Sequence, residues 1–291
     1  MRLVSYNIQF SFGKDGRGDL ARVAGEVRGA DVIALQEVER FWTRSGNVDQ
    51  VAELARLLPD YHWVYGPGLD TDASITGPDG RPVHRRRQFG NMLLSKTPIL
   101  SSRNHMLPKF ATLTQYSLQR CALEGVVATG VGPVRFYSIH LTHLSDETRA
   151  PQVERILEIH ARAPTEGGAW AGGHPTDPNW TEGGMPPMPR VAILMGDFNF
   201  SPTSPLYAKI VGPLSPEYGR LNNPEGFVDA WVATGHGEHE GVTCYSDTHN
   251  AVKRIDYCYV SSSLAPRLKR AWIDNDAQGS DHQPIWTELD A

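Results

Sequence analysis

The segment Val191–Met195 is a short run of apolar residues that follows a proline-rich stretch and leads directly into Gly196-Asp197-Phe198-Asn199. A run of this length and composition is typical of a strand buried in a sheet. A simple turn that caps the strand is one interpretation of the polar residues at its end. However, side chains two residues apart in extended backbone project to the same side. Asp197 and Asn199 are therefore expected to act together on a metal ion, a water molecule or a phosphate group.

Runs typical of strands alternate with runs typical of helices along the whole sequence. The predicted strands cover residues 3–8, 32–35, 62–65, 90–95, 99–106, 118–128, 134–140, 191–195, 254–260, 267–273 and 284–289. The predicted helices cover residues 19–27, 47–58 and 147–162, and a short helix is expected to begin at Ser204-Pro205. Because no segment repeats and no linker divides the pattern, residues 1–291 are expected to form a single α/β or α+β domain.

The composition is that of an ordinary globular protein, with 40% hydrophobic and 21% charged residues. The formal net charge is -5 at pH 7. Proteins that bind nucleic acids through many phosphate contacts usually carry a surplus of positive charge. The acidic balance therefore disfavours a protein that coats nucleic acid, although it allows a local basic patch.

The three cysteines, Cys121, Cys244 and Cys258, are far apart and lack the spacing of a metal site. Cys121 and Cys258 lie in apolar runs, so both are expected to be buried free thiols, as in proteins of a reducing compartment. No stretch predicts a transmembrane helix, and the strand-like start at Arg2 does not resemble a signal peptide. We therefore expect a cytoplasmic protein. The sequence does not predict an oligomeric state.

Two long polar segments interrupt the pattern of strands and helices. Residues 66–88 are predicted to be a loop that carries the basic run Arg85-Arg86-Arg87, which is more often a solvated surface than a binding site. Residues 163–190 are rich in glycine and proline and contain Trp170 and Trp180. Loops of this length in a compact domain are usually functional or disordered. Because the second loop connects the strand before His140 to the strand before Asp197, we expect it to form a lid or wall of the substrate pocket.

Several other predicted strands also begin or end with polar side chains. These side chains belong to Asn7, Glu37, His140, His143, Asp256, Asp281 and His282. Packing alone rarely places so many carboxylates, carboxamides and imidazoles at strand ends. Carboxylates such as Glu37 and Asp281 are hard oxygen ligands that suit Mg²⁺ or Mn²⁺. Imidazoles suit proton transfer or contact with a phosphate.

These strand ends resemble the motifs of the endonuclease/exonuclease/phosphatase superfamily, which includes abasic-site endonucleases, pancreatic-type deoxyribonuclease, neutral sphingomyelinases and inositol-polyphosphate 5-phosphatases. The matching segments follow the family's order and cover the chain from end to end. They are Ser5-Tyr6-Asn7, Leu35-Gln36-Glu37-Val38, Gly90-Asn91-Met92-Leu93-Leu94-Ser95, Ser138-Ile139-His140-Leu141, Gly196-Asp197-Phe198-Asn199, Arg254-Ile255-Asp256-Tyr257 and Ser280-Asp281-His282. The resemblance implies a four-layer α/β sandwich, in which two central mixed sheets are flanked by helices and the site lies at one edge.

The resemblance also implies a metal site and a mechanism of metal-assisted phosphoester hydrolysis. Glu37 resembles the principal metal-binding glutamate of the family, Asn7 the asparagine that helps to hold the metal or phosphate, and Asp281 a further metal ligand. The implied cofactor is Mg²⁺ or Mn²⁺, which polarises a phosphate oxygen and offsets charge on the leaving oxygen.

The remaining motif residues resemble the catalytic groups of the family. Asp197 resembles the residue that orients or deprotonates the attacking water, and Asn199 a contact to a phosphate oxygen. His282 resembles the histidine that contacts the scissile phosphate, and Asp256 the carboxylate that fixes its tautomer. His140 resembles a second histidine that stabilises charge or protonates the leaving group.

Other polar residues near the motifs are given structural interpretations. Arg120 and Arg254 are interpreted as structural charges beside the site. His143 is either a site residue or a loop histidine with satisfied hydrogen bonds, and the second interpretation is preferred. No spacing suggests ligation for seven further histidines, His62, His84, His105, His160, His236, His239 and His249.

Three interpretations of the substrate stay open. The preferred one is a phosphodiester or phosphomonoester that is small or lipid-derived. It is favoured by the net charge and by Gln9, because abasic-site endonucleases usually carry an aspartate two positions after the first asparagine. A nuclease is the alternative, in which the arginines of residues 85–87 follow a phosphate backbone. A binding protein without catalytic activity is the third, and the complete set of site residues makes it the weakest.

Overall fold

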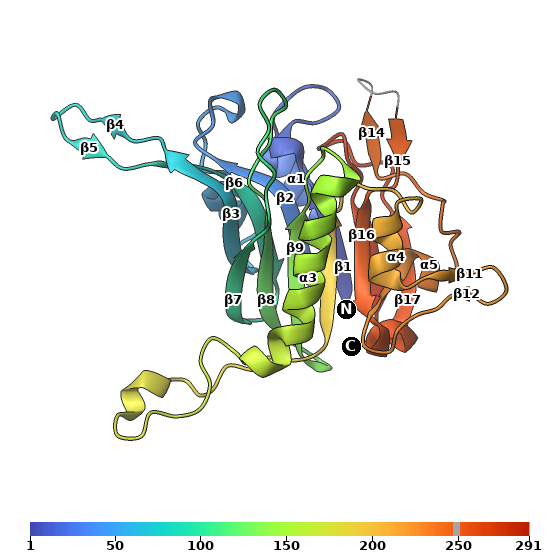
Figure 1. Ribbon diagram of the computed structural model, residues 1–291. Coiled ribbons are helices and arrows are strands. Elements are labelled where there is room, and N and C mark those ends of the chain that lie inside the picture. The colour runs from blue at the N-terminus through green and yellow to red at the C-terminus, as the bar shows by residue number, and fades with distance from the viewer. Residues whose placement is uncertain (247–250, 291) are drawn as a thin grey trace.

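The computed structural model describes residues 1–246 and 251–290 and contains two six-stranded sheets that pack face to face (Figure 1). Sheet 1 has the strand order β17-β18-β1-β2-β6-β3, and sheet 2 has the order β13-β16-β10-β9-β8-β7. Strands β1 and β2 are parallel, as are β9 and β10, whereas the other pairs are antiparallel, so both sheets are mixed. This confirms the predicted α/β sandwich.

The strand bounds follow the predicted pattern closely. Sheet 1 contains β1 (Arg2–Asn7), β2 (Val32–Arg40), β3 (His62–Asp72), β6 (Arg86–Ser95), β17 (Leu268–Ile273) and β18 (Ile285–Leu289). Sheet 2 contains β7 (Ile99–Met106), β8 (Cys121–Thr129), β9 (Gly132–His140), β10 (Ala192–Asp197), β13 (Phe227–Asp229) and β16 (Asp256–Ser261). Short two-stranded pairs are β4 (Ile75–Thr76) with β5 (Pro82–Val83), β11 (Leu214–Ser215) with β12 (Gly219–Arg220), and β14 (Cys244–Ser246) with β15 (Ala251–Lys253).

Helices form the two outer layers. The helices are α1 (Leu20–Val27) and α2 (Gln50–Leu57) on sheet 1, α3 (Asp146–Glu166) and α4 (Pro205–Val211) on sheet 2, and the short α5 (Ala230–Ala233). The predicted capping residue Asp19 accepts a hydrogen bond from the Arg22 amide at 2.9 Å. The helix predicted to start at Asn47 instead begins at Gln50, because the Asp49 carboxylate caps it.

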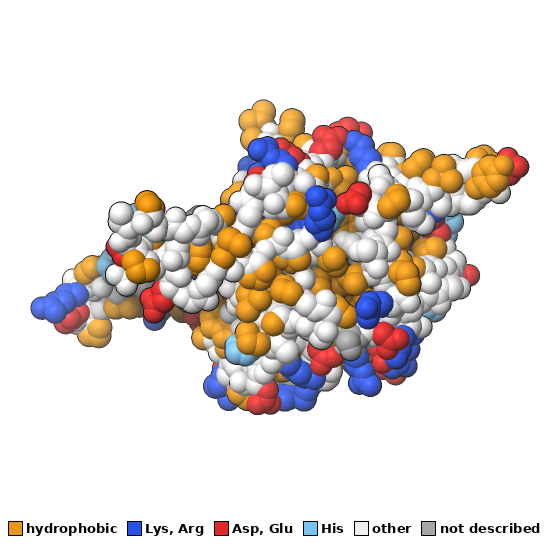
Figure 2. All heavy atoms as spheres, turned by 90° about the horizontal axis from the view of Figure 1, so that it is seen from below, with side chains coloured by type: hydrophobic (Ala, Val, Ile, Leu, Met, Phe, Trp, Pro, Cys, Tyr) orange, Lys and Arg blue, Asp and Glu red, His pale blue; other side chains and the backbone are white. Residues whose placement is uncertain are grey.

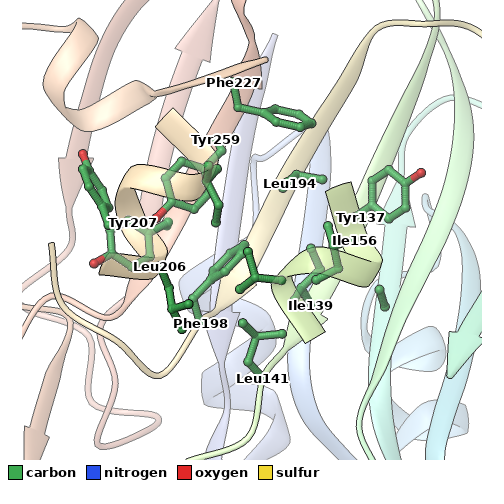
Figure 3. Packing of buried hydrophobic residues seen from close by; sticks show 14 of the residues in the cluster. Tyr137, Ile139, Leu141, Ile156, Leu194, Phe198, Leu206, Tyr207, Phe227 and Tyr259 are labelled. Atoms are coloured by element: carbon green, nitrogen blue, oxygen red, sulfur yellow. The ribbon is translucent and has the colours of Figure 1, made fainter. Parts of the chain in front are cut away.

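Aromatic and aliphatic side chains fill the layer between sheet 2 and its helices (Figure 3). Phe198, from the segment after β10, is fully buried in this cluster. Its ring centroid lies 5.0 Å from that of Tyr259 and 5.8 Å from that of Tyr257, both edge-on. Burying a ring of this size contributes about 2–3 kcal/mol to stability. Phe198 therefore anchors the backbone between Asp197 and Asn199 to the core.

Polar side chains of the motifs tie the two sheets together. The Gln36 amide donates to Ser138 Oγ at 2.9 Å, and Ser138 Oγ donates to the Leu35 carbonyl at 2.8 Å. The Asn91 amide donates to the carbonyls of Cys121 and Ser138, each at 2.9 Å. Buried polar groups are costly unless they are hydrogen-bonded. These bonds therefore favour one alignment of the sheets, in which their strand ends meet at a common edge.

The predicted loop at residues 66–88 is largely a β-hairpin, so that prediction was wrong. Strands β3 and β6 continue their pairing as far as Asp72 and Arg86, and β4 and β5 form the tip (Figure 1). The pairing of β3 with β6 accommodates the glycines and the proline of this segment through a register shift between Pro67 and Leu69. A Cβ added at Gly90 would lie 2.1 Å from the Gly66 carbonyl oxygen. Glycine and proline usually indicate turns in a sequence. In this hairpin they instead allow a β-bulge and close packing of the two strand backbones.

The prediction that residues 163–190 wall the site was also wrong. Because β9 and β10 are parallel, α3 must carry the chain back to the opposite edge of sheet 2. The segment after α3 lies at that edge (yellow in Figure 1), where the Arg135 guanidinium donates to the carbonyls of Pro189 at 2.8 Å and Arg190 at 2.9 Å. A strand of six residues such as β10 spans about 20 Å, and that length separates this segment from Asp197.

Figure 2 shows the face at this opposite edge, where apolar side chains gather near the middle and charged side chains lie mostly toward the rim. In the described ranges 1–246 and 251–290, no helix is both long enough and apolar enough to cross a lipid bilayer. Cys121 and Cys258 are buried free thiols, as predicted, and Cys244 is free and partly buried.

The replacement Gly196→Ala is expected to destabilise the protein by at least about 1 kcal/mol. Gly196 has a φ of +155°, and an added Cβ would lie 1.9 Å from the Ile139 carbonyl oxygen of the neighbouring strand. Urea unfolding measures the effect. The control is Gly25→Ala in α1, where an added Cβ has no neighbour within 4 Å; we expect it to stabilise by about 0.4–1 kcal/mol. Equal effects of the two changes would contradict this explanation.

Candidate active site

The structure brings the predicted site residues together at one edge of the sandwich, the upper edge in Figure 1. In sheet 2, Asp197 at the end of β10 pairs in register with His140 on one side and Asp256 on the other. In sheet 1, Asn7 ends β1 and lies opposite Gln36 in β2. The site is therefore assembled from the ends of strands in both sheets.

Asn7 connects the two halves of this site. Its side chain is buried, with 1% of the residue exposed. The amide donates to Glu37 Oε1 at 3.1 Å and to Asp197 Oδ2 at 3.0 Å, and it lies 3.5 Å from His282 Nε2. Asn7 thus links a carboxylate of sheet 1 to a carboxylate of sheet 2.

Uncommon backbone conformations position several of these side chains. Glu37 has a φ of +60° at a β-bulge, where the register of β2 against β6 shifts between Leu35 and Val38. Asn199 has a φ of +55°. Positive φ costs a residue other than glycine about 1–3 kcal/mol and clusters at functional sites. The bulge re-aims Glu37 toward the edge, which the strict alternation of a strand would not do.

Asp197 accepts hydrogen bonds with both carboxylate oxygens. Oδ1 accepts from the Asn199 amide N–H at 2.8 Å, and Oδ2 accepts from Asn7 at 3.0 Å and from the Asn199 side chain at 3.3 Å. Only 2% of the residue is exposed. Burial and the negative charge of Asp256 raise the pKa of Asp197 to about 7. Asp197 is thus a carboxylate able to accept a proton near neutral pH.

Asn199 uses its side-chain amide inside the site. It donates to the Leu141 carbonyl at 3.0 Å and to Asp197 Oδ2 at 3.3 Å. In this arrangement Asn199 orients Asp197. Its expected contact with a phosphate oxygen stays a prediction, and it requires the side-chain oxygen or a rearranged amide.

His282 and Asp256 form a hydrogen-bonded pair. The Asp256 Oδ2 atom lies 2.8 Å from His282 Nδ1, and both residues are buried. Burial alone would lower the pKa of His282, but the charges of Asp256 and Asp197 raise it well above its ordinary value. His282 therefore carries a positive charge at neutral pH, with Nε2–H 3.9 Å from Asp197 Oδ2.

His140 has the opposite environment. Arg120 donates from its guanidinium to His140 Nδ1 at 2.8 Å. Because a guanidinium only donates, Nδ1 must accept and the single proton of the ring resides on Nε2. Burial and the charge of Arg120 lower the pKa of His140 well below its ordinary value. His140 is thus a neutral donor whose Nε2 lies 3.4 Å from Asp197 Oδ2 and 3.9 Å from Glu37 Oε1.

Sequence reasoning interpreted Arg120 as a structural charge beside the site and missed its contact with His140. Arg120 is 6% exposed, and its guanidinium also lies 3.4 Å from Nδ1 of His143, which places His143 at the rim of the site. The one available signal was an arginine directly before the apolar strand β8, a position where a charge needs a partner. Arg254 is structural as predicted, since it pairs with Asp229 at 2.7 Å and both side chains are buried.

The other histidines do not join the site where the structure describes them. His105 lies 3.4 Å from Glu124, and His160 Nδ1 lies 3.0 Å from the Arg135 guanidinium. His249 lies outside the described residues.

Replacing Arg120 with methionine is expected to raise the pKa of His140 and to free its tautomer, because the variant removes both a positive charge and the donor to Nδ1. Imidazole nitrogen NMR signals recorded across a pH titration measure both effects. Arg103→Met in β7 is the control, since Arg103 pairs with Glu166 and Glu124 away from the site. A titration of His140 that is the same in both variants would contradict the assignment.

The donor set fits a divalent cation. Burial raises the pKa of Glu37, and the nearby charge of Asp281 raises it further. Asp256 Oδ1 is buried and has no hydrogen-bond partner among the residues described. Ligand atoms of Asp197, Asp256 and His282 lie within 4.8 Å of one another. Several carboxylates close together repel one another unless a cation lies between them. Mg²⁺ and Mn²⁺ prefer such oxygen ligands.

The tight Asp197, Asp256 and His282 group differs from the predicted metal ligands Glu37, Asn7 and Asp281. His282 Nδ1 already contacts Asp256 at 2.8 Å, which favours a hydrogen-bonded catalytic pair over a metal ligand. Glu37 is the better candidate ligand because its side chain keeps 20% of its surface exposed at the edge. The Asp281 carboxylate accepts from Ser280 Oγ at 3.3 Å, and its predicted ligand role rests on its charge near Glu37.

Comparisons with known proteins agree with this geometry. Residues 4–282 match the model of the Endonuclease/Exonuclease/phosphatase family. A search of curated protein sequences found no match. Similar solved structures include a member of this family from Bacteroides vulgatus, with 17% identity, a TM-score of 0.65 and coverage of 99% of this chain and 98% of that chain.

Two further structures are similar at low sequence identity. A mannosyl-6-phosphatase from Bacteroides thetaiotaomicron has 18% identity, a TM-score of 0.62 and full coverage, 100%, of both chains. A humanised D. rerio TDP2 has 16% identity and a TM-score of 0.57, with coverage of 100% of this chain and 99% of that chain. At such identities the likeness shows the fold.

Proposed function

The chain belongs to the endonuclease/exonuclease/phosphatase family, whose members hydrolyse phosphoester bonds, and from this premise we propose that it is a metal-dependent phosphoesterase. The observation that carries the proposal is the contrast between the two histidines. Asp256 keeps His282 cationic, whereas Arg120 keeps His140 neutral with its proton on Nε2. Both rings direct donors at the space beside Asp197, which is the arrangement that a phosphate with anionic oxygens requires.

Each residue then has a defined task in the proposed reaction. Asp197 orients the attacking water and accepts its proton, for which a pKa of about 7 is well matched. The His282 cation binds an equatorial phosphate oxygen, and Asp256 holds its ring in place. His140 donates from Nε2 to another oxygen, so it stabilises charge rather than protonates the leaving group. Asn199 orients Asp197.

Glu37, Asn7 and Asp281 are the proposed ligands of a divalent cation, Mg²⁺ or Mn²⁺. When bound there, the ion supplies Lewis-acid polarisation of a phosphate oxygen and offsets charge on the leaving oxygen. Asn7 additionally holds Glu37 and Asp197 at a fixed separation, because its amide donates to both.

We propose a small or lipid-derived phosphodiester or phosphomonoester as the substrate. One similar structure bears the name of a phosphatase, mannosyl-6-phosphatase, which supports a small phosphoester. A nuclease is the second candidate, because the hairpin that carries Arg85 and Arg87 lies at the site edge of sheet 1. All residues 1–291 are proposed to form one domain around the shared core between the two sheets.

A panel of substrates tests the proposal. The purified protein is assayed with a chromogenic phosphodiester, a chromogenic phosphomonoester, sphingomyelin vesicles and plasmid DNA, each with Mg²⁺, Mn²⁺ or Ca²⁺. We expect hydrolysis of at least one ester that requires the metal and that is lost on chelation. Asp197→Ala is assayed beside the wild type. Near wild-type hydrolysis by Asp197→Ala would contradict the assignment, and absence of any metal-dependent hydrolysis would favour a binding protein.

A further inference from the structure

Arginine and aromatic side chains form a continuous strip that leads away from the catalytic cluster. Phe89 connects this strip to the site, because its ring centroid lies 6.2 Å from that of His140. The Arg44 guanidinium carbon lies 5.9 Å from the centroid of Phe89, 4.8 Å from that of Trp42 and 4.1 Å from that of Phe10. A guanidinium is therefore packed among three aromatic rings directly beside the site.

The strip continues onto the β3–β6 hairpin. The Arg87 guanidinium carbon lies 5.9 Å from the centroid of Trp42, and that of Arg85 lies 5.3 Å from the centroid of Phe41. We call this surface the Arg–aromatic strip, and it consists of Phe10, Phe41, Trp42, Arg44, Arg85 and Arg87. None of these residues belongs to the sequence motifs that build the catalytic site.

The strip is held in place by contacts that do not need a ligand. Trp42 Nε1 donates to the Gln88 carbonyl at 2.8 Å. Arg44 Nε donates to the buried Glu39 carboxylate at 2.8 Å. Phe10 and Phe41 have positive φ values of 44° and 57°, and such backbone strain persists only where the surroundings impose it. A surface that is rigid before binding loses less entropy when a ligand binds.

The arginines of the hairpin and of the neighbouring strand β2 differ in whether a carboxylate neutralises them. Arg86 pairs with Asp70 at 2.8 Å, and Arg40 pairs with Asp49 at 2.6 Å. In contrast, Arg85 and Arg87 have no carboxylate within ion-pair distance among residues 1–246 and 251–290. Both are half-buried against aromatic rings, in a protein whose net charge is -5. Unpaired arginines beside aromatic rings complement a ligand in which an anionic group is attached to a planar ring.

Resting on the phosphoesterase function proposed above, we propose that the Arg–aromatic strip binds a nucleotide unit of the substrate. A planar base stacks on Trp42 or Phe41, and the phosphate beside that base pairs with Arg85 and Arg87. Alternating cations and aromatic faces are the features with which proteins bind unpaired nucleotides. An acyl chain would leave the guanidiniums without an anionic partner, and a sugar phosphate offers no aromatic face, so among the phosphoesters proposed above the strip favours one that contains a nucleotide. The nucleotide belongs either to a small dinucleotide or to a single strand of nucleic acid.

Binding measurements test this assignment separately from catalysis. The protein carries Asp197→Asn to prevent turnover, and fluorescence anisotropy with Mg²⁺ follows a labelled ten-nucleotide oligothymidylate over a salt series. We expect Trp42→Ala to weaken binding by about 5- to 150-fold. The double variant Arg85→Ala with Arg87→Ala is expected to reduce the salt slope by about 0.7, because the two arginines share one phosphate and each phosphate contact on a single strand contributes about 0.7.

Matched controls separate recognition from folding. Arg86→Ala removes an arginine that alternates to the other face of β6, and it should leave both affinity and salt slope unchanged. Trp42→Phe keeps a ring and should retain most of the affinity, which a general loosening of the hairpin would not allow. An abasic decamer of equal charge should bind the intact strip as weakly as oligothymidylate binds Trp42→Ala.

A dinucleotide that binds as tightly as the decamer identifies a small nucleotide substrate, whereas affinity that grows with length identifies a strand, and both support the proposal. Equal binding of the abasic and base-bearing decamers would overturn it, as would binding to vesicles of anionic phospholipid without binding to either nucleotide. Metal-dependent hydrolysis of a chromogenic phosphodiester reports on the proposed function independently, so hydrolysis without oligonucleotide binding refutes this inference alone.

Discussion

Replacing Asp197 with asparagine is expected to lower the rate of phosphoester hydrolysis by about 10²- to 10⁴-fold, because the variant cannot accept the proton of the attacking water. Asparagine keeps the size of the side chain and one of its two oxygens, so either the Asn7 amide or the Asn199 backbone N–H retains its acceptor. Steady-state kinetics at saturating metal measure the change. Asp60→Asn, an exposed position after α2, is the control and should keep the wild-type rate.

The same replacement is expected to change how stability depends on pH. Burial and Asp256 raise the pKa of Asp197 to about 7 in the folded protein, whereas an unfolded aspartate titrates near about 4. A carboxyl group with a raised pKa favours folding at low pH, and this contribution is lost as the pH rises from about 4 to about 7. Urea unfolding of the metal-free protein should therefore show a fall in stability over this range that Asp197→Asn reduces. An identical fall in both proteins would contradict the assigned pKa.

Replacing Asp256 with asparagine is expected to lower the hydrolysis rate by about 10²- to 10⁴-fold, because the His282 cation loses the charge that sustains it. Burial then dominates and lowers the pKa of His282. In the wild type, this histidine stabilises the folded protein below about pH 6.5, and the stabilisation is lost as the pH rises through its higher folded pKa. The variant should lack that contribution. As the pH rises, the residual activity of the variant should decline at a lower pH than the activity of the wild type. The pH dependence of the rate measures this shift.

A double-mutant cycle provides the control for this pair. If Asp256 acts through His282, then His282→Gln and the double variant should lose similar amounts of activity, so that the effects are far from additive. Additive losses would show that Asp256 contributes through another contact. The direct bond of 2.8 Å between the two side chains leads us to expect strong coupling.

Much of the fold and most of the candidate site followed from the sequence. The apolar runs of strands such as β10 are strong signals because buried strands need them, and Asp197 and His282 stand beside such runs. Arg120 could not be identified in this way. Its partner His140 lies on the neighbouring strand β9, and nothing in the spacing of the two residues shows that a guanidinium reaches an imidazole nitrogen across the ladder.

The two long segments were harder to predict for different reasons. Residues 66–88 contain glycines and prolines that usually mark turns, but a bulge near Pro67 allows the β3–β6 ladder to pass them. For residues 163–190 the error lay in topology. A segment between two strands that both end at the site need not lie at the site, because parallel strands require the connection to return to their starting edge.

The hydrogen bonds of Asn7 mean that catalysis depends on how the two sheets are docked. Its amide spans from Glu37 of sheet 1 to Asp197 of sheet 2, and both bonds are close to 3 Å. A substitution between the sheets that slides one against the other by a fraction of an ångström would separate the proposed metal ligands from the proposed general base while both layers remain folded. Loss of activity should therefore precede loss of secondary structure when the protein is heated or mildly denatured. Neither half of the sandwich would hold a working site alone.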